Sequence, residues 1–257
     1  MFFLIAGPCV VENEEVTFTV AEHLKKVTQK LGIKLIFKSS YKKANRTKLD
    51  SFTGLDRAKA LEILAKVRKK FSLPVLTDIH ESWEAAEVAQ YVDYLQIPAF
   101  LCRQTDLLLA AGRTGKPVNI KKGQFMSPYT MKYAVEKVYS TGNRQVMLTE
   151  RGSMFGYNDL VVDFRSVPIM KSFGVPVVVD CTHSTQKPNQ TSGVTGGDPQ
   201  MIETLALAAV ATGADGLFME VHPEPAKALS DAASQLQMDR AEEILAKCVD
   251  VYHAVHK

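Results

Sequence analysis

Long hydrophobic runs are missing from this sequence of 257 residues. No stretch approaches the roughly 20 consecutive apolar residues that a membrane-spanning helix needs. The apolar start of the chain, residues 1–9, has no basic segment before it, and Pro8 stands where a signal-peptide cleavage site needs small residues. We therefore expect no membrane span and no cleaved leader, interpret residues 2–7 as a buried strand, and predict a cytoplasmic protein.

Cysteine is scarce and scattered. The four cysteines, Cys9, Cys102, Cys181 and Cys248, are far apart in the chain and form no CxxC pair. Small secreted proteins that depend on disulfides carry dense cysteine frameworks, which this spacing excludes. Free thiols in a reducing compartment are the better interpretation.

Net charge is also small. Lys plus Arg number 31 and Asp plus Glu number 28, which gives a formal net charge of +3. This balance does not favour nucleic acid as a partner. A hydrophobic fraction of 46% and a charged fraction of 23% exclude a disordered or collagen-like chain. Without a linker, a repeat or a low-complexity tail, the length fits one large domain or two small ones.

Short apolar runs rich in β-branched residues are present along the whole chain. Their interiors are nearly continuous in apolar residues, as in Val-Val-Val at residues 177–179. This pattern is typical of strands that are buried on both faces in a parallel sheet. The eight runs cover residues 2–7, 34–40, 74–80, 94–99, 117–123, 145–151, 176–183 and 216–222.

Segments with helical periodicity separate these runs. In residues 14–31, for example, Val20, Leu24 and Val27 follow one another at spacings of four and three. The predicted helices cover residues 14–31, 55–71, 82–91, 104–113, 128–140, 159–172, 199–212 and 239–256.

A strand followed by a helix, eight times in a chain of this length, predicts a (β/α)8 TIM barrel of the α/β class. An open doubly wound sheet is the main alternative, but eight complete units without a topological switch point favour the closed barrel. We expect one catalytic domain over residues 1–257 and no added regulatory domain. Residues 184–199, rich in Gly, Ser, Thr and Pro, are predicted to form a long loop that could act as an active-site lid.

Basic residues follow several of the predicted strands at their carboxyl ends, where barrel enzymes carry their active sites. Burying much positive charge is costly unless anions compensate it. One lysine at a strand end is usually a solvated rim residue, whereas six favour a site for substrates with several phosphate or carboxylate groups. The six are Lys38, Lys43, Arg46, Arg103, Lys121 and Arg151.

A second group of residues has the chemistry of metal ligands. Cys9, His183, Glu220 and Asp231 are predicted to lie at the carboxyl ends of the first, seventh and eighth strands, which become neighbours when the barrel closes. A thiolate, an imidazole and two carboxylates suit Fe²⁺, Mn²⁺, Co²⁺ or Zn²⁺. Taken singly, each residue would be interpreted as a packed cysteine or a hydrogen-bonded polar group, and no HxxxH or CxxC spacing supports the set.

The strand ends also carry motifs that resemble those of one enzyme family. In chain order these are Ile5-Ala-Gly-Pro-Cys9, Lys38-Ser-Ser40, Lys43-Ala-Asn-Arg46, Thr77-Asp-Ile-His-Glu81, Gln96-Ile-Pro-Ala-Phe-Leu-Cys-Arg-Gln-Thr-Asp106, Lys121-Lys-Gly-Gln-Phe125, Thr149-Glu-Arg-Gly152, Phe155-Gly-Tyr-Asn158, Asp180-Cys-Thr-His183, Met219-Glu-Val-His-Pro-Glu224 and Ser230-Asp-Ala-Ala-Ser-Gln-Leu236. They span essentially the whole chain and closely resemble the motifs of the 3-deoxy-D-manno-octulosonate 8-phosphate synthases.

The resemblance implies that phosphoenolpyruvate condenses with D-arabinose 5-phosphate and water. The products would be the eight-carbon sugar acid phosphate, which feeds lipopolysaccharide inner-core synthesis, and inorganic phosphate. The three anionic groups of the two substrates agree with the concentration of basic residues. The resemblance implies a homotetramer, no organic cofactor, and no nucleic-acid or membrane partner.

One motif separates this family from the related 3-deoxy-D-arabino-heptulosonate 7-phosphate synthases, which use erythrose 4-phosphate. Those enzymes carry Lys-Pro-Arg-Thr-Ser after the second strand, whereas this chain has Lys43-Ala-Asn-Arg-Thr47. The extra Asn45 would bind hydroxyl groups of the longer sugar. Thr47 replaces the serine of most relatives and keeps the hydroxyl group. Heptulosonate synthesis is therefore the alternative function.

The family also divides by metal requirement. Members that need no metal have asparagine at the position of Cys9 and proline at the position of Gly123. Cysteine and glycine at these positions resemble the metal-dependent branch. The resemblance therefore supports Cys9, His183, Glu220 and Asp231 as ligands of a divalent transition metal.

Matching positions take roles from the resemblance. Lys121 and Arg151 would hold the phosphate of phosphoenolpyruvate, and Lys38 and Lys43 its carboxylate. The other substrate-binding positions are Gln96 and Ala99 in the phosphoenolpyruvate pocket, and Asn45, Arg46, Thr47, Asp78 and Arg103 around arabinose 5-phosphate.

Two of these assignments concern the sugar phosphate itself. Arg46 would bind it directly, and Arg103 would reach it from a neighbouring subunit. The positions that we assign to catalysis are Lys43, Asn45, His183 and Asp231.

Two other classes of protein also fit the basic residues. A Schiff-base aldolase would use Lys121 or Lys122 at the end of the fifth strand. A sugar-phosphate binding protein would bind the same anions without releasing phosphate from phosphoenolpyruvate.

Overall fold

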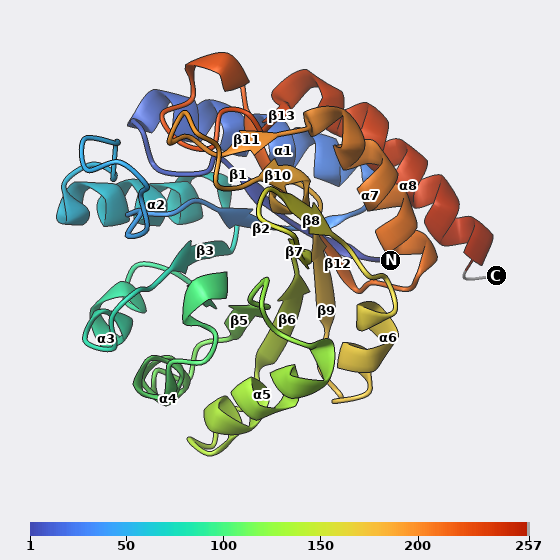
Figure 1. The fold of residues 1–257 in the computed structure, drawn as a ribbon. Helices are drawn as coiled ribbons and strands as arrows, with labels where there is room; N and C mark the ends of the chain where they lie inside the picture. The colour runs from blue at the N-terminus through green and yellow to red at the C-terminus, as the bar shows by residue number, and fades with distance from the viewer. Residues whose placement is uncertain (256–257) are drawn as a thin grey trace.

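In the computed structural model, which describes residues 1–255, eight parallel strands close into a barrel (Figure 1). The strands are β1 (Phe3–Gly7), β2 (Lys34–Lys38), β3 (Val75–Asp78), β4 (Tyr94–Ile97), β5 (Val118–Lys121), β6 (Val146–Glu150), β9 (Val177–Asp180) and β12 (Gly216–His222). The barrel closes where β12 pairs with β1, and Gly7 lies opposite Glu220 in that register. The predicted fold class is thus confirmed.

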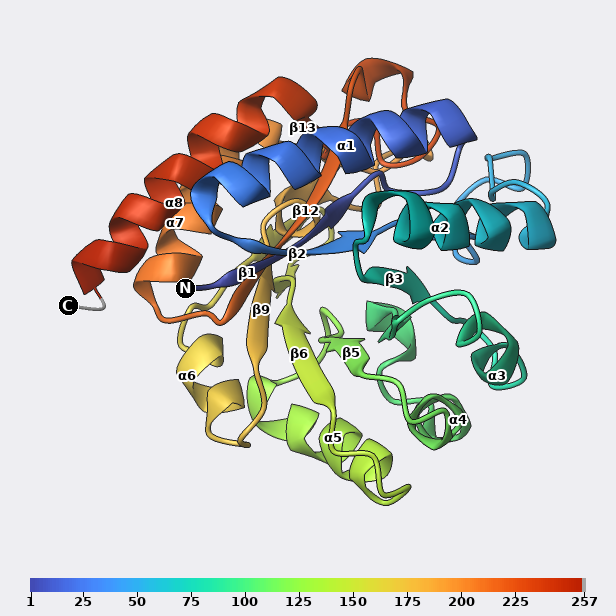
Figure 2. The same ribbon diagram turned by 180° about the vertical axis from the view of Figure 1, so that it is seen from behind.

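Helices surround the barrel on the outside. They are α1 (Glu14–Leu31), α2 (Arg57–Phe71), α3 (Glu84–Val88), α4 (Thr105–Arg113), α5 (Met131–Tyr139), α6 (Ser166–Lys171), α7 (Ile202–Ala211) and α8 (Ala241–Val255). Figure 2 shows α1 lying between α2 and α8. Residue 256, the predicted end of the last helix, lies outside the described residues.

Apolar residues fill the barrel and the layer around it. Side chains of successive strand residues alternate between the interior and the helix-facing side, so a strand in this fold is apolar on both faces. Inside the barrel one cluster consists of Ile5, Ile36, Leu76, Met147, Val178 and Phe218. A larger cluster lies between the strands and the helices.

Helix α1 illustrates how the local sequence sets an element. The Asn13 side chain accepts a hydrogen bond from the Val16 N–H at 2.8 Å and caps its start. Gly32 ends it in the left-handed conformation, with φ of 68°. Between these caps, Leu24 is fully buried against the strands, where truncation to alanine costs about 2–5 kcal/mol.

One predicted helix is wrong over its first half. Residues 159–172 were expected to be helical, but β7 (Ser153–Phe155) and β8 (Asp159–Val161) form an antiparallel hairpin, and the helix begins only at Ser166. Gly156 in the connecting turn has φ of 70°, a conformation that glycine adopts without steric cost. This hairpin crosses the carboxyl end of the barrel (Figure 1).

Short elements complete the chain. The strands are β10 (Gln186–Lys187), β11 (Gly196–Gly197) and β13 (Leu236–Gln237), and the 3₁₀ helices are η1 (Ala99–Leu101), η2 (Pro128–Thr130), η3 (His183–Thr185), η4 (Pro199–Met201), η5 (Pro225–Lys227) and η6 (Met238–Arg240). Strands β10 and β11 pair within the predicted loop 184–199. Among the helices described, none is long and apolar enough to cross a membrane.

Candidate active site

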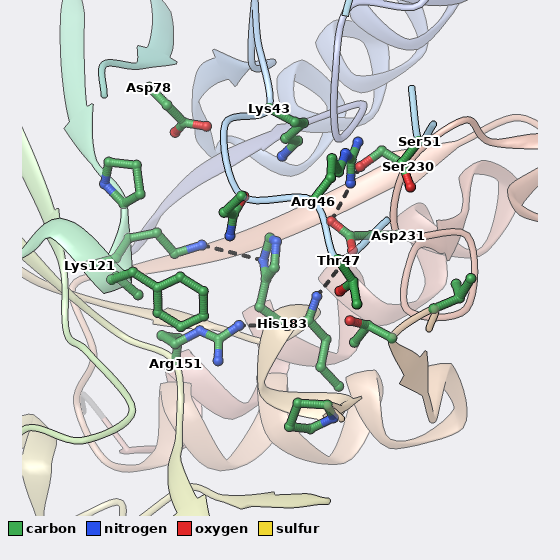
Figure 3. A pocket seen from close by; sticks show the side chains of 18 of the residues that line it. Lys43, Arg46, Thr47, Ser51, Asp78, Lys121, Arg151, His183, Ser230 and Asp231 are labelled. Atoms are coloured by element: carbon green, nitrogen blue, oxygen red, sulfur yellow. Dashed lines mark hydrogen bonds between the residues drawn. The ribbon is translucent and has the colours of Figure 1, made fainter. Parts of the chain in front are cut away.

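A cavity of about 490 Å³ opens at the carboxyl ends of the barrel strands. Figure 3 shows its side chains converging from several strands and loops. Predicted site residues that line it are Lys38, Lys43, Asn45, Arg46, Thr47, Asp78, Gln96, Ala99, Lys121, Arg151, His183 and Asp231. The topology thus brings together residues that the chain spreads over almost its whole length.

Four of the cationic side chains at this cavity are buried. Lys38, Lys43, Lys121 and Arg151 are between 1% and 9% exposed. Charge buried to this degree needs partners of opposite sign. Protein carboxylates supply part of this compensation.

Lys38 and Glu220 form one buried ion pair at the floor of the cavity. The Lys38 Nζ donates to Glu220 Oε1 at 2.6 Å and to the Cys9 carbonyl oxygen at 3.0 Å. Burial would raise the pKa of the Glu220 carboxyl, but the neighbouring His183, Lys38 and Lys43 lower it well below its usual range. Glu220 is therefore a carboxylate at neutral pH.

Lys121 is held by Asp180 from the neighbouring side of the barrel. Its Nζ lies 2.6 Å from Asp180 Oδ2 and 4.2 Å from the centre of the Phe218 ring. Burial lowers the pKa of the Lys121 ammonium, and the positive charge of Arg151 acts in the same direction against the pull of Asp180. An incoming anion would stabilise the charged form.

The Arg151 guanidinium has unused hydrogen-bond donors. Its Nη2 donates to Gln186 Oε1 at 2.6 Å, whereas its buried Nε and Nη1 have no hydrogen-bond partner among the described residues. In Figure 3, Arg151 and Lys121 reach toward His183 from the same side of the cavity. A planar fork of free N–H groups beside an ammonium is the arrangement that binds a phosphate group.

Asp78 belongs to a chain of hydrogen bonds across the barrel. Its carboxylate accepts hydrogen bonds from Ser40 Oγ and from Gln96 Nε2. Asn119 Nδ2 donates to Gln96 Oε1 at 2.8 Å, and Asn119 Oδ1 accepts a hydrogen bond from Thr149 Oγ1 at 2.7 Å. Burial alone would raise the pKa of the Asp78 carboxyl. The surrounding groups, chiefly the charges of Lys38 and Lys43, together outweigh burial, so this pKa lies below its usual range. The chain holds Asp78 and Gln96 rigidly at the cavity wall.

Three of the four predicted metal ligands lie together. One donor atom from each of Cys9, Glu220 and Asp231 falls within 4.8 Å of the other two. The Glu220 Oε2 atom is buried and has no hydrogen-bond partner within residues 1–255. A buried carboxylate oxygen that accepts no hydrogen bond, beside a thiol and a second carboxylate, fits a divalent transition metal.

His183 lies at the edge of this cluster. Its Nε2 is 3.5 Å from Glu220 Oε2, and its Nδ1 is 2.7 Å from Asp180 Oδ2. A carboxylate on Nδ1 fixes the ring so that Nε2 faces the other ligands, which is a common arrangement around metal-binding histidines. The residues present therefore fit a four-ligand site of Cys9, His183, Glu220 and Asp231.

Cys9 and Asp231 are set for this arrangement by the fold. The Cys9 Sγ lies 2.9 Å from Ser230 Oγ and 3.1 Å from Asp231 Oδ2. Burial, together with Glu220, raises the pKa of the Cys9 thiol well above its usual value, so a cation would be needed to favour the thiolate. Asp231 has φ of 48°, a left-handed conformation that is uncommon for residues other than glycine and that concentrates at functional sites.

Three predicted positions stand apart from the cavity wall. Cys9 and Glu220 are fully buried below it, and Arg103 is exposed and does not line the cavity formed by the described residues. Arg46, by contrast, faces the cavity and is anchored through Nε, which donates to the Phe52 carbonyl oxygen at 2.8 Å. An Arg103 that serves this site would have to come from another subunit.

Sequence reasoning assigned no role to Asp180, which connects the two halves of the site. Its Oδ2 accepts from Lys121 and contacts the His183 ring, while its Oδ1 accepts the backbone N–H groups of Thr182 and His183. Gln186, which links Arg151 to Asp231, was also missed. Asp180 stands in a motif next to His183, and this position was the only signal for it in the sequence.

Comparisons with known proteins agree with this geometry. A family model described as "DAHP synthetase I family" matches residues 1–257. A protein of Francisella philomiragia named "2-dehydro-3-deoxyphosphooctonate aldolase" is 52% identical over 254 residues, which are 99% of this chain and 92% of that protein. Proteins of the same name from Desulfatibacillum aliphaticivorans and Desulfotalea psychrophila are 51% and 50% identical, over 98% and 99% of this chain and 92% and 91% of their own.

The chain belongs to the 2-dehydro-3-deoxyphosphooctonate aldolase family. The name of the family model is that of the heptulosonate enzymes, whereas these relatives all carry the octonate name. This is the family that the motifs predicted under the name of the 3-deoxy-D-manno-octulosonate 8-phosphate synthases, so that prediction is confirmed.

Proposed function

We propose that the protein condenses phosphoenolpyruvate with D-arabinose 5-phosphate and water to give 3-deoxy-D-manno-octulosonate 8-phosphate and inorganic phosphate. The observation that carries the proposal is the buried pair of Lys121 and Arg151 beside the candidate metal ligands, with guanidinium N–H groups left for an anion. The octonate name of the relatives favours the eight-carbon product over the heptulosonate alternative.

Lys121 and Arg151 would bind the phosphate of phosphoenolpyruvate, and Lys38 and Lys43 would attract its carboxylate. Burial would lower the pKa of Lys43, but Cys9 and the carboxylates of Glu220 and Asp78 raise it above its usual range, so Lys43 stays charged. The four cations hold an enol that carries two anionic groups close to a second phosphorylated substrate. Positioning two anions that repel each other is the larger part of this catalytic problem.

Arabinose 5-phosphate would lie toward the outer part of the cavity. Asn45, Arg46 and Thr47 line this part from the loop between β2 and α2, and Asp78 faces it from the end of β3. Asn45 and Asp78 would bind hydroxyl groups of the sugar, and Arg46 its phosphate. The aldehyde carbon then points at C3 of the enol.

In the reaction, the enol C3 forms a bond to the aldehyde carbon, and the aldehyde oxygen takes up a proton. Water loses one proton as its oxygen bonds to C2, and the resulting C2 hydroxyl loses the other as the C–O bond from C2 to phosphate breaks, which leaves the C2 carbonyl and inorganic phosphate. Lys121 and Arg151 would stabilise the charge on the departing phosphate. Lys43 would supply the proton at the aldehyde oxygen, and His183 would act as a ligand of the proposed metal.

A divalent transition metal, Fe²⁺, Mn²⁺, Co²⁺ or Zn²⁺, would be held by Cys9, His183, Glu220 and Asp231. When bound, it would supply Lewis-acid polarisation of the sugar carbonyl or of the attacking water. The buried Glu220 Oε2, which accepts no hydrogen bond among the described residues, and the nearby Cys9 thiol support this assignment.

We further propose that the protein is a homotetramer in the cytoplasm. Phosphorylated substrates cannot cross a bilayer unaided, so they would be made and used there. The product would enter lipopolysaccharide synthesis. Phe100, Phe155 and Tyr157 are 55%, 70% and 84% exposed, an amount of aromatic surface that favours burial against another subunit. Arg103 lies three residues from Phe100 and could reach a neighbouring cavity from such an interface.

The deciding experiment compares release of inorganic phosphate from phosphoenolpyruvate with arabinose 5-phosphate and with erythrose 4-phosphate. We expect strong preference for the five-carbon sugar. Preference for the four-carbon sugar would establish the heptulosonate alternative, and tight binding without phosphate release would indicate a binding protein. Borohydride should trap no substrate on Lys121, because its ammonium is paired with Asp180.

A further inference from the structure

The Lys122 ammonium is buried beside the active-site cavity but does not line it. Its Nζ lies 3.2 Å from the Gly152 carbonyl oxygen and 3.1 Å from Ser153 Oγ. Two more carbonyl oxygens, of Gly123 and Met126, lie 3.4 and 3.5 Å away. Lys122 thus connects the end of β5 to the turn that follows β6, and it has no path to a substrate carbonyl.

Glu150 holds the same turn from the other side. Its Oε1 accepts the backbone N–H groups of Arg151 at 3.0 Å and Gly152 at 2.7 Å, and it lies 3.3 Å from Lys122 Nζ. The N–H of Gly152 is therefore fixed by the carboxylate and its carbonyl by the ammonium. Gly152 has φ of 88°, so the turn between these contacts is one that glycine is needed to form.

This turn sets the direction of Arg151. Arg151 stands between Glu150, the last residue of β6, and Gly152. The Glu150 side chain accepts the N–H groups of Arg151 and Gly152, and the Lys122 ammonium donates to the Gly152 carbonyl oxygen. The guanidinium itself contacts only Gln186 among the described side chains by a hydrogen bond. Its placement therefore depends on the backbone from which it extends.

Stability alone does not account for the buried ion pair of Lys122 and Glu150. Buried ion pairs can often be replaced by apolar residues of similar volume without loss of stability, because removing two charges from water is costly. Here the two charged groups are directed at backbone N–H and C=O groups on both sides of one arginine. A structural pair with no link to the site would have no need to be centred on that turn.

We propose that Lys122 and Glu150 are positioning residues that orient Arg151 for the phosphate group of phosphoenolpyruvate. This inference rests on the proposed function, because it takes that phosphate as the ligand of Arg151. Neither side chain touches substrate. Lys122 acts through the carbonyl of Gly152, and Glu150 through the N–H groups of Arg151 and Gly152.

The test measures binding of phosphoenolpyruvate and of arabinose 5-phosphate separately, by calorimetry, to the wild type and to Lys122→Met. We expect about a tenfold weaker affinity for phosphoenolpyruvate in the variant, because small displacements of a binding group cost this much or more. Affinity for arabinose 5-phosphate should not change. Unchanged phosphoenolpyruvate affinity in a folded variant would overturn the inference.

Lys171→Met is the matched control. The Lys171 Nζ also donates to a backbone carbonyl, of Gly213, and to a carboxylate, of Asp215, each at 2.8 Å, but both precede β12 at the opposite end of the barrel. This variant should bind phosphoenolpyruvate like the wild type. An equal loss in both variants would indicate a general effect on stability and would overturn the inference.

A double-mutant cycle with Arg151→Ala tests the route of the effect. If Lys122 acts through Arg151, Lys122→Met should cause no further loss once the guanidinium is gone. Additive losses would contradict a role through Arg151. Should Lys122→Met fail to fold, Ser153→Ala removes one partner of the ammonium and should weaken phosphoenolpyruvate binding about twofold to threefold, again only when Arg151 is present.

Failure of the proposed function would give a different result. In that case the wild type itself would not bind phosphoenolpyruvate. Wild-type binding with normal affinity in Lys122→Met would instead overturn the positioning role alone.

Discussion

Asp180 shows how one residue organises this site. A single buried carboxylate contacts the Lys121 ammonium, the His183 ring and the backbone at the start of η3. Burial would raise the pKa of the Asp180 carboxyl, but His183 and Lys121 lower it well below its usual range, so it is ionised at neutral pH. The proposed phosphate site and the proposed metal site therefore share one positioning group.

Replacing this group should affect both sites. In Asp180→Asn, the Oδ1 contacts with the backbone can persist, but an amide –NH₂ would face the Lys121 ammonium and the His183 Nδ1. We expect metal affinity to fall about 10- to 100-fold, as is usual when the partner of a metal-bound histidine is lost. Competition with a chelator of known affinity measures this.

The matched control for that experiment is Asp215→Asn, which removes a carboxylate at the other end of the barrel, paired with Lys171. Its metal affinity should equal that of the wild type. Wild-type metal affinity in a folded Asp180→Asn protein would show that His183 does not depend on Asp180.

Site residues were predictable from sequence where residue type and strand position were sufficient. Cys9, Glu220 and most of the cationic residues lie at or just after the carboxyl ends of strands, and a parallel barrel brings such positions to one end. Asp180 was not predictable as the partner of Lys121, because they lie 59 positions apart and their contact depends on which way each side chain points. The sequence likewise did not show that Lys121 lines the cavity and Lys122 does not. Side chains of successive residues along a strand point to opposite sides, so these two neighbours have different surroundings.

At the scale of elements, the strands were predicted better than the helices. All eight barrel strands lie within the predicted runs, because strands covered on both faces must be apolar throughout. The segment around residue 160 was assigned to a helix because its apolar residues also suit a helical spacing. Pairing between β7 and β8, which depends on the turn at Gly156, decides the structure there.

Glu84 gives helix α3 a dependence on pH. Its Oε2 accepts the N–H groups of His80 at 2.7 Å and Glu81 at 3.2 Å, and Lys42 Nζ lies 3.9 Å from its Oε1. Burial would raise the pKa of the Glu84 carboxyl, but the His80 ring and these N–H groups, together with Tyr41, lower it to about 2. The stabilisation from ionised Glu84 is thus complete above the usual value of 4.5 and is lost as pH falls from 4.5 toward 2.

Glu84→Gln should remove this contribution. At pH 7 we expect the free energy of unfolding to fall by about 1–3 kcal/mol, the usual cost of breaking a buried charged hydrogen bond. The difference from wild type should shrink as pH falls below about 4.5. Urea unfolding at a series of pH values measures it, and a difference that stays constant down to pH 3 would contradict the assignment to Glu84.

At the scale of the whole molecule, activity should depend on a metal. Exhaustive chelation is expected to abolish phosphate release from phosphoenolpyruvate, and Mn²⁺, Co²⁺, Fe²⁺ or Zn²⁺ should restore it. Full activity in protein with no detectable metal would contradict the four-ligand site.

Cys9→Asn, which places at this position the residue of the metal-free branch, should retain activity after the same treatment, and a folded but inactive Cys9→Asn would contradict that expectation.

Subunit assembly can be tested through Arg103. Arg103→Ala should impair use of arabinose 5-phosphate, and Arg151→Ala should impair use of phosphoenolpyruvate. If Arg103 serves a neighbouring cavity, mixed assemblies of the two variants should recover activity in about a quarter of their sites, as a symmetric pairwise interface predicts. No recovery in assemblies that contain both variants would mean that Arg103 does not act between subunits.

The closure of the barrel between β1 and β12 has a consequence for the synthesis of the protein. Cys9 leaves the ribosome long before Glu220 and Asp231, and the pairing of Gly7 with Glu220 brings these residues together. No incomplete chain that ends before residue 231 holds all these groups. The proposed metal can therefore be held by all of its ligands only after synthesis has passed Asp231 and the barrel has closed, so its loading would report that closure.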